Sequence, residues 1–388
     1  MSVFEPVFAE HALFQLPDFP DWVMRAACPA DNQQLLALVA SAMPSSGLML
    51  SLSRQPDYFA ACHAAFMQSE TWVIAAAAQP EQVVGMYTLS ARPCYVEGQV
   101  EMLRYLGDFR IDPAVRGQKL TRLVMRHLRT RLPDQYYAQA VVLADNKVAK
   151  QTLHRPHQDF VTQYTDQTLY TMTMTGCRHT AQVDTPQAAL SHRVANADDV
   201  AQMNQFVQSM AVHFNFLPRY DFADVLSQHP YWQGLQIGDF TLVFRGRELV
   251  GLYGLWDQKA FKQTRVVSYH PLIGLLRPLY NIWARHNQRL LLPPKGELLH
   301  YLMLHSPLCR PDEIDVFDYM VQTAFAQTLQ RGVAALCYSL IEHDPRRVVQ
   351  SRHYGNVIRG LHGFYSFGEN PAPRFDRQRL TYLECGRI

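Results

Sequence analysis

The alternation of apolar and polar residues along the chain predicts a mixture of short amphipathic helices and strands. The clearest helix covers residues 118–132, because apolar residues recur there at the helical period and arginines fall on the opposite face. Its apolar face consists of Leu120, Leu123, Val124 and Leu128. In the first half of the chain the pattern predicts strands at 21–27, 72–78, 83–91, 100–111, 137–144 and 160–174, and helices at 31–43, 57–68, 118–132 and 146–154.

Similar segments occur in the same order in the two halves of the chain. Residues 84–87 read VGMY and residues 250–253 read VGLY, and each follows a strand-like segment and a short polar turn. EMLRYL at 101–106 resembles ELLHYL at 297–302, and RAACPADNQQL at 25–35 resembles HRVANADDVAQM at 192–203. Three ordered matches predict an internal repeat. We therefore expect two units, residues 1–176 (copy one) and 190–388 (copy two), joined by a polar linker.

Copy two contains an insertion near residues 258–296 that has no counterpart in copy one. Between residues 259 and 295 it has seven Lys and Arg and no Asp or Glu. We expect a helix with a kink at Pro278. The first interpretation is a helix packed across the interface between the copies; an acceptor-site wall or protein-interaction face comes second, and an anionic membrane or nucleic-acid contact third. The apolar face of this helix consists of Leu272, Leu275, Leu276, Leu279, Ile282 and Trp283.

Composition narrows the class of protein. Of 388 residues, 48% are hydrophobic and 18% are charged, with a formal net charge of +2. These values argue against long disordered tails and against a protein that coats nucleic acid. No segment resembles a signal peptide or an apolar membrane span. The seven cysteines are scattered without a CxxC pair, which predicts neither disulfides nor structural zinc, and the histidines form no metal-ligand pattern. We expect a cytoplasmic globular protein without a metal.

The stretch from Tyr105 to Leu128 is the most informative for chemistry. A strand ends near Ile111, a turn follows, and Arg116-Gly117-Gln118 leads directly into the helix. Free backbone N–H groups and the helix dipole at such a junction favour an anion, for example a pyrophosphate. An ordinary strand–turn–helix with a glycine for positive φ is the alternative that local physics alone favours.

The same residues resemble a known family. The order of elements around DFRIDPAVRGQKLTRLVMRHL is similar to that of the GNAT superfamily of acyl-CoA-dependent N-acyltransferases. The resemblance implies an α+β fold made of two tandem GNAT-like domains, each a twisted, mainly antiparallel sheet flanked by helices. It also implies acetyl-CoA or another acyl-CoA as co-substrate, with its pyrophosphate held by the amides of the loop. The implied binding residues are Ile111, Arg116, Gly117, Gln118, Lys119, Leu120, Thr121 and Asn146.

Three positions depart from the family pattern. Lys119 stands where the family prefers Gly, and Thr121 where it prefers Gly or Ala. Leu153 occupies the place of a Tyr that often serves as general acid to the CoA thiolate.

The family mechanism needs a base that takes a proton from the acceptor ammonium, directly or through water. Glu101 and Asp108 are the candidates, because both lie on the predicted strand 100–111. They are seven positions apart, so on a regular strand only one of them faces the cleft unless a bulge intervenes. The alternative for each is a strand-edge carboxylate paired with Arg104 or Arg110.

The corresponding loop of copy two predicts a lost binding site. The segment HSPLCRPDEIDVF, from His305, has two prolines, no glycine and three acids at the start of the helix. Carboxylates there would repel a pyrophosphate. We expect copy one to transfer an acetyl or short acyl group to a primary amine, with one CoA per chain.

Two other functions stay open at this stage. One is a non-catalytic acyl-CoA-binding or protein-interaction module, and the other is an aminoacyl- or long-chain-acyl transferase. We expect no stable nucleic-acid partner and no transmembrane segment. Homo-oligomerisation and the identity of the acceptor are left open.

Overall fold

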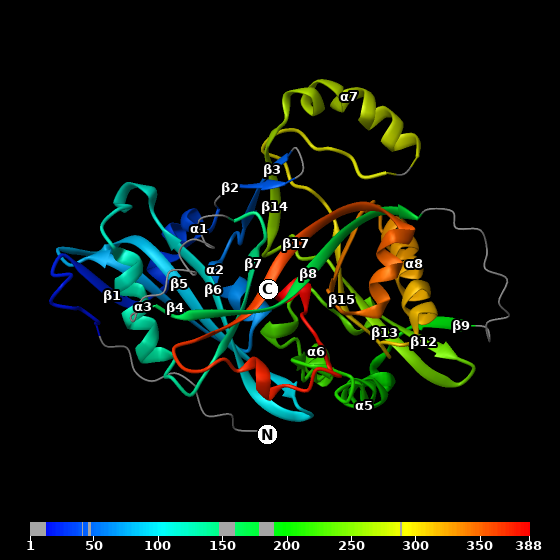
Figure 1. Cartoon of the computed structure of the whole chain (residues 1–388). Helices are drawn as coiled ribbons and strands as arrows, with labels where there is room; N and C mark the ends of the chain where they lie inside the picture. The colour runs from blue at the N-terminus through cyan, green and yellow to red at the C-terminus, as the bar shows by residue number, and fades with distance from the viewer. Residues whose placement is uncertain (1–12, 41, 46–47, 147–159, 178–189, 288) are drawn as a thin grey trace.

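The computed structural model describes residues 13–40, 42–45, 48–146, 160–177, 190–287 and 289–388 (Figure 1). All of the predicted helix at 146–154 except its first residue, and most of the linker, lie outside these residues, as do Ala149 and Leu153. In copy one the elements are β1 (Trp22–Ala26), α1 (Asn32–Val39), β2 (Ala42–Ser45), β3 (Leu48–Ser53), α2 (Tyr58–Ala65), β4 (Gln68–Ala76), β5 (Gln79–Val96), β6 (Gln99–Ile111), α3 (Leu120–Arg131), β7 (Ala138–Leu143) and β8 (Thr162–Cys177).

Copy two follows a similar order with additional short elements. They are β9 (Leu190–Val194), α5 (Val200–Met210), β10 (Phe214–Asn215), β11 (Leu217–Pro218), α6 (Ala223–Leu226), β12 (Phe240–Arg245), β13 (Glu248–Trp256), β14 (Gln263–Tyr269), α7 (Pro271–His286), β15 (Leu302–Cys309), α8 (Ile314–Gln330), β16 (Leu336–Ile341), β17 (His353–Ser366) and β18 (Leu380–Thr381).

Most of the helices and strands expected in copy one are present, but the predicted end of one helix is wrong. The helix expected over 31–43 ends at Val39, and the hairpin β2–β3 follows it. Sequence periodicity missed this hairpin because it is completed from far away: β3 pairs antiparallel with β14 of the insertion. The amphipathic helix is confirmed as α3, whose residues Leu120, Leu123, Val124 and Leu128 are all buried.

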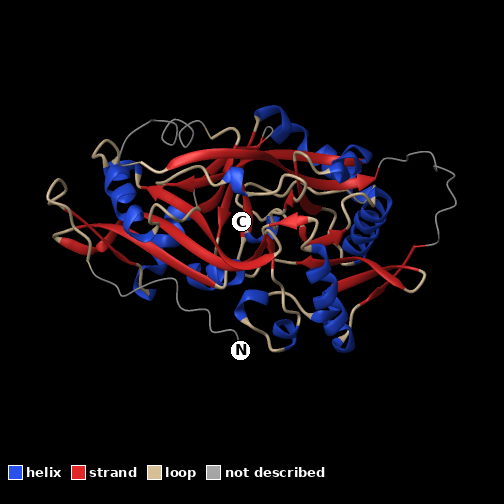
Figure 2. Ribbon diagram, turned by 60° about the horizontal axis from the view of Figure 1, so that its bottom comes forward, coloured by secondary structure: helices blue, strands red, loops and turns tan. Residues whose placement is uncertain are grey.

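Strands β2, β3 and β14 form a small separate sheet, and β10 pairs with β18. The other strands form one sheet that runs through both copies. Its order is β1-β4-β5-β6-β7-β17-β8-β16-β15-β13-β12-β9, with β11 added beside β5. Figure 2 shows the strands through the middle of the molecule with helices on the outside. The fold is therefore α+β, a mixed sheet flanked by helices.

The two expected sheets are joined by an exchange of their last strands. The closing strand of copy two, β17, lies between β7 and β8 of copy one, and β8 in turn pairs with β16 of copy two. All three pairings are antiparallel. Because each copy is completed by the other, their sheets cannot separate without breaking these strand pairs.

Equivalent ion pairs show how closely the two copies repeat the same local structure. Arg25 binds the Asp31 carboxylate through two nitrogens, each at 2.7 Å, and Arg193 binds Asp199 in the same way at 2.7 and 2.6 Å. In both copies the carboxylate also accepts the backbone N–H three residues before it, and a helix follows.

Strand register corrects one of the sequence matches. In copy one Met86 pairs with Arg110, and in copy two Leu252 pairs with Leu308. Arg110 and Leu308 are therefore equivalent, which shifts the match of EMLRYL with ELLHYL by two residues.

Each copy has its own apolar core between the sheet and a helix. In copy one α3 packs against strand residues such as Trp72 and Tyr87. In copy two α8 packs against Tyr253 and Tyr338.

The insertion reaches copy one through its strand β14, which pairs with β3, but its helix does not pack across the interface as expected. Its helix α7 stands away from the main sheet, above β3 and β14 (Figure 1). The apolar face is exposed, with Leu275 at 76%. The helix also continues through Pro278 to His286.

Candidate functional site

A V-shaped opening between β6 and β7 lies at the centre of copy one. Among the described residues the two parallel strands share two register pairs, Arg104 with Ala138 and Tyr105 with Gln139. Beyond these pairs β6 continues to Ile111 and β7 to Leu143 without pairing to each other. The Tyr105 hydroxyl accepts the Val141 N–H at 3.3 Å near the vertex, and burial raises the pKa of Tyr105 to about 12. The unpaired backbone beyond the vertex offers hydrogen-bonding groups to a ligand.

A β-bulge at Asp108 interrupts β6 within this opening. Asp108 has φ 48°, and the register of β5 against β6 shifts between Met86 and Thr88. Positive φ is tolerated better by Asp than by most residues, which helps this sequence form a bulge here. We expected Glu101 and Asp108 to face opposite sides because side chains alternate along a regular strand. The bulge interrupts that alternation.

The two candidate bases lie in different places. Asp108 is in the opened part of β6, whereas Glu101 is exposed and precedes the vertex by three residues. Among the described residues, the Asp108 carboxylate pairs with neither Arg104 nor Arg110. It binds Arg54 at 2.5 Å and accepts the Tyr58 hydroxyl at 2.9 Å. Burial raises the pKa of Tyr58 well above its usual value, so it remains a hydrogen-bond donor at neutral pH.

Sequence reasoning missed Arg54 and Tyr58, and no motif marks them. Arg54 directly follows β3, and its position depends on the insertion: β14 places Gln263 opposite Ser53. The Gln263 side chain accepts from the Ser53 hydroxyl at 2.9 Å and donates to the Gln55 carbonyl at 2.7 Å. Burial, together with the Arg54 charge, lowers the pKa of Lys262 on the same insertion to about 8. The insertion thus forms one wall of the site around Asp108.

The predicted phosphate loop is open and positively charged. Arg116, Gly117, Gln118 and Lys119 are exposed, Gly117 has φ 90°, and Lys119 has φ 59° directly before α3. The positive φ expected for Gly117 is confirmed. A Cβ atom on Gly117 would meet nothing within 4 Å, so the backbone there is accessible.

A cavity of about 320 Å³ adjoins this loop at the start of α3. Lys119 and Arg122 give it cationic groups, while Asp18 and Asp21 line another part. The full lining is Asp18, Phe19, Pro20, Asp21, Trp22, Gln118, Lys119 and Arg122.

The remaining predicted binding residues take varied positions. Ile111 ends β6 and is half-buried, as is Thr121 in the first turn of α3. Leu120 is buried in the core, so only its backbone can face a ligand. Asn146 is exposed just after β7, and its N–H donates to the Leu143 carbonyl at 2.9 Å.

Copy two repeats the opening and the bulge. Strands β15 and β16 share two parallel pairs, Leu302 with Leu336 and Met303 with Cys337. Ser306, with φ 43°, occupies the bulge position that Asp108 occupies in copy one.

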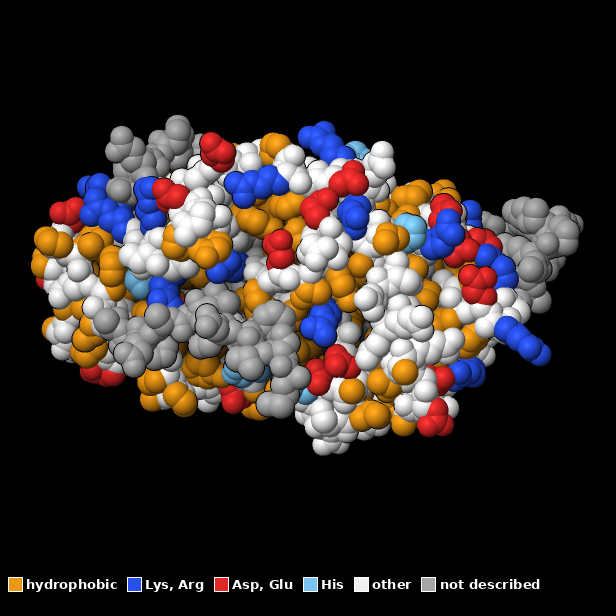
Figure 3. All heavy atoms as spheres, turned by 90° about the horizontal axis from the view of Figure 1, so that it is seen from below, with side chains coloured by type: hydrophobic (Ala, Val, Ile, Leu, Met, Phe, Trp, Pro, Cys, Tyr) orange, Lys and Arg blue, Asp and Glu red, His pale blue; other side chains and the backbone are white. Residues whose placement is uncertain are grey.

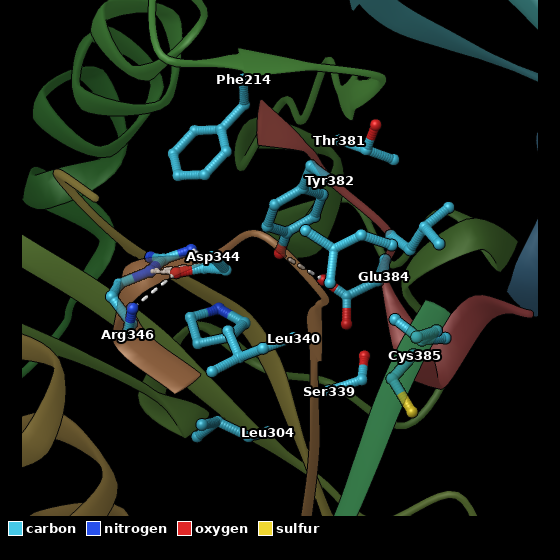
Figure 4. Close-up of a pocket in the computed structure, with 14 residues that line it drawn as sticks. Phe214, Leu304, Ser339, Leu340, Asp344, Arg346, Thr381, Tyr382, Glu384 and Cys385 are labelled. Atoms are coloured by element: carbon cyan, nitrogen blue, oxygen red, sulfur yellow. Dashed lines mark hydrogen bonds and ion pairs between the residues drawn. The ribbon is translucent and has the colours of Figure 1, made fainter. Parts of the chain in front are cut away.

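The opening of copy two is filled by the chain's own carboxyl-terminal segment. Residues 381–385 pass between β15 and β16, and the cavity that remains there is about 20 Å³ (Figure 4). The Glu384 carboxylate accepts the Ser306 N–H at 2.8 Å and the hydroxyls of Tyr220 and Tyr382 at 3.0 and 2.9 Å. Burial raises the pKa of Glu384, while its hydrogen bonds oppose that effect.

Arg387 fixes this segment on its other side. It is fully buried and donates to the carbonyls of Ala64 and Tyr231, both at 2.6 Å, and to the His305 ring at 3.1 Å. Burial lowers the pKa of His305, which keeps the ring neutral and able to accept this bond.

The loop between strand and helix also differs in copy two. Four residues, 310–313, separate β15 from α8, whereas 112–119 separate β6 from α3. Arg310 pairs with Asp312 at 2.9 Å, and Arg245 pairs with Glu313 at 2.5 Å and with Asp315 at 3.3 Å. The cations beside this helix start are already bound to carboxylates.

Neither a metal cluster nor a membrane-spanning helix is found in the described part of the chain. No group of three or more His, Cys, Asp or Glu side chains there has an arrangement that could hold a metal ion. Within the same residues, no helix combines the length and the hydropathy needed to cross a bilayer.

Comparison with known proteins identifies the fold. No family model and no curated protein matches the sequence. A GCN5-related N-acetyltransferase from Sphaerobacter thermophilus matches with a TM-score of 0.54 and 12% identity over 94% of this chain and 100% of that one. A glucosamine N-acetyltransferase region in a fungal β-N-acetylglucosaminidase matches with a TM-score of 0.57 and 10% identity, covering 89% of this chain and 38% of the other.

A third similar structure is Saccharomyces cerevisiae N-myristoyltransferase with bound myristoyl-CoA. Its TM-score is 0.54 at 8% identity, with 98% of this chain and 96% of that chain covered. The split sheet, the bulged strand and the strand–loop–helix junction, together with these likenesses, show that the chain has the fold of the GNAT superfamily.

Proposed function

We propose that the protein is an N-acyltransferase that moves an acetyl or other short acyl group from acyl-CoA to a primary amine. We assign acyl-CoA binding to copy one, residues 1–176, and a supporting role to copy two, residues 190–388. The observation that carries this proposal is the contrast between the two openings. The opening of copy one leads to an exposed, cationic loop, whereas that of copy two holds Glu384.

The residues of copy one suit a CoA thioester. The backbone of Arg116 to Lys119 is accessible at the start of α3, where amides and the helix dipole favour a pyrophosphate. Lys119 and Arg122 line the adjoining cavity and add positive charge for the phosphates. When bound, the co-substrate supplies an activated acyl thioester.

The bulge of β6 would orient and polarise the thioester carbonyl. In copy two the equivalent backbone N–H, that of Ser306, points into the opening and holds a carboxylate oxygen at 2.8 Å. The Asp108 N–H has the same place in copy one, so it would offer a hydrogen bond to the thioester oxygen.

Asp108 would remove the proton from the acceptor ammonium, directly or through water. Its carboxylate is held by Arg54 and Tyr58, which fix its direction beside the bulge. Glu101 lies before the vertex and is the weaker candidate for this step. Tyr58 and Lys262 are the nearby groups that can pass protons on.

Thioester cleavage tests the proposal directly. We expect acetyl-CoA to release free CoA in the presence of a suitable primary amine, with little release from the amine-free enzyme. We also expect acetyl-CoA at about 100 times its Kd to stabilise the fold by about 2.7 kcal/mol. A protein that binds acyl-CoA but acylates no amine in a broad panel would instead be a binding module, and one whose melting ignores millimolar acetyl-CoA would contradict both functions.

A further inference from the structure

The insertion helix α7 is held with its apolar face outward. Six large apolar side chains along one side are exposed by 52–76%. The opposite side is anchored: the Tyr280 hydroxyl donates to the Leu290 carbonyl at 3.1 Å, and Asn281 exchanges two hydrogen bonds of 2.9 Å with Leu292. Ala284 on that side is fully buried. The exposed residues are Leu272, Leu275, Leu276, Leu279, Ile282 and Trp283.

The six exposed side chains of α7 do not pack against an apolar core of the described part of this chain. A large contiguous apolar patch on a protein surface marks an interaction site. Its anchored face fixes α7 in one orientation, so the patch is not a fluctuation of a loose helix.

The charge around the helix indicates what covers the patch. The segment 259–295 has seven Lys and Arg, while all 34 Asp and Glu of the chain lie outside it. Lys262 lies in the wall around Asp108, and Lys259 pairs with Asp257. Arg277 and Arg285, however, belong to α7 itself. Arg285 and Lys295 are exposed within it. By contrast, the face of the molecule in Figure 3 carries acidic and basic side chains side by side.

We propose that α7 docks in the plane of an anionic lipid bilayer. An exposed apolar face of Leu, Ile and Trp beside basic residues is the pattern of a helix that lies in the interface and contacts anionic headgroups. Trp283 provides the amphipathic ring that is enriched at the level of the headgroups.

A second copy of the chain fits the patch less well. A helix of 16 residues is about 24 Å long, and a single face of it offers far less than the roughly 800 Å² per partner of a stable dimer. Two copies meeting here would also bring two basic segments together. The lipid surface therefore accounts for both the apolar and the charged character of the insertion.

Vesicle sedimentation tests this proposal on the full chain without any substrate. We expect binding to vesicles containing phosphatidylglycerol, weaker binding to pure phosphatidylcholine, and a loss of binding as salt is raised. L275E combined with L279E should weaken binding by about tenfold or more, because two Leu side chains leave the bilayer. The matched control is L226E on α6, whose side chain is 49% exposed outside the insertion and should leave binding unchanged.

Tryptophan quenching locates the contact. Trp72, Trp232 and Trp256 are buried, and Trp22 is half-buried in β1, far from α7 (Figure 1). Quenching by brominated phosphatidylglycerol should therefore come mainly from Trp283 and should fall with W283F. Absence of vesicle binding, or equal binding by the wild type and the L275E/L279E variant, would overturn the proposal. A concentration-dependent dimer that L275E/L279E dissociates, without any vesicle binding, would identify a second copy as the occupant instead.

Discussion

The openings in the two copies have the same backbone geometry, but different side chains lie in them. Both lie between parallel strands joined by two register pairs, and both have a bulge at a residue with positive φ, Asp108 or Ser306. In copy one the bulge residue is charged and the loop beyond it is exposed. In copy two the bulge N–H binds Glu384 from the chain itself.

This difference fits the proposed function, in which copy one binds the co-substrate and the same part of copy two contributes to stability. The segment ending in Glu384 and Arg387 gives copy two the hydrogen bonds that a ligand would otherwise supply. Its aromatic and charged side chains leave only about 20 Å³ between the strands. We infer that copy two has an internal contact where copy one would hold a ligand. Four sets of substitutions test the comparison between the copies.

Gly117→Pro should have the largest effect. Proline requires φ near −65°, whereas Gly117 has φ 90°, so the loop must rearrange and lose the amide geometry that we propose for pyrophosphate binding. We expect CoA binding by calorimetry to fall by at least about 100-fold. The matched control is Gly332→Pro in copy two, which also replaces an exposed glycine of positive φ (74°), and CoA affinity should not change. Equal losses in both variants would place the pyrophosphate elsewhere or indicate a global effect.

Asp108→Asn should lower kcat/KM by about 100-fold or more, the usual contribution of a general base. Asn tolerates positive φ, so the bulge should persist, and calorimetry should still detect CoA binding. Ser306→Ala at the equivalent bulge and Glu101→Gln before the vertex are the comparisons, and each should change activity by less than about threefold. A Glu101→Gln loss as large as that of Asp108→Asn would contradict the assignment of the base.

Glu384→Ala should destabilise the fold by about 3–5 kcal/mol, because it leaves a buried backbone N–H and two tyrosine hydroxyls without their acceptor. Glu384→Gln keeps an acceptor oxygen and should cost less than half as much. Urea unfolding measures both, and the Kd for CoA in copy one should remain the same. A second CoA site appearing in Glu384→Ala would mean that the segment blocks a functional site.

The smallest effect should be the difference in stability loss between substitutions in the two equivalent ion pairs. Arg25 is 19% exposed and Arg193 is 46% exposed, so Asp31→Asn should cost about 2–3 kcal/mol and Asp199→Asn about 1 kcal/mol less. Urea unfolding at neutral pH measures the two losses. A larger loss at Asp199 would contradict the ranking by exposure.

The stability that these two ion pairs contribute should depend on pH. Burial opposes ionisation of Asp31, but hydrogen bonds from Arg25 and the Cys28 N–H hold its pKa below the ordinary value, and the Arg193 hydrogen bond does the same for Asp199. A lowered folded-state pKa stabilises the fold above the unfolded pKa of about 3.9, and this contribution is lost as pH falls through the folded pKa. Each Asn variant should therefore lose less stability than the wild type over that acidic range.

The regular elements of copy one could be predicted because local patterns encode them. The four apolar residues of α3 recur at the helical period and are all buried, and Gly117 stands where positive φ is needed. The repeat was recognisable from short matches, although a shift of two residues in the third match became visible only from strand register.

Features made by distant segments could not be predicted. Arg54 reaches Asp108 from a hairpin that β14 completes, and Glu384 meets Ser306 across 78 positions of the chain. The exchange of β8 and β17 likewise depends on long-range pairing. Periodicity showed that α7 has an apolar face but could not show that this face points outward.

Isothermal titration of the full chain with CoA tests the central claim most directly. We expect one site per chain, lost in Gly117→Pro and retained in Glu384→Gln. The cations of copy one lie in an exposed loop, whereas Arg310 and Arg245 of copy two are bound to carboxylates and Glu384 occupies the bulge N–H. Two equivalent sites per chain, or a single site that survives Gly117→Pro, would contradict it.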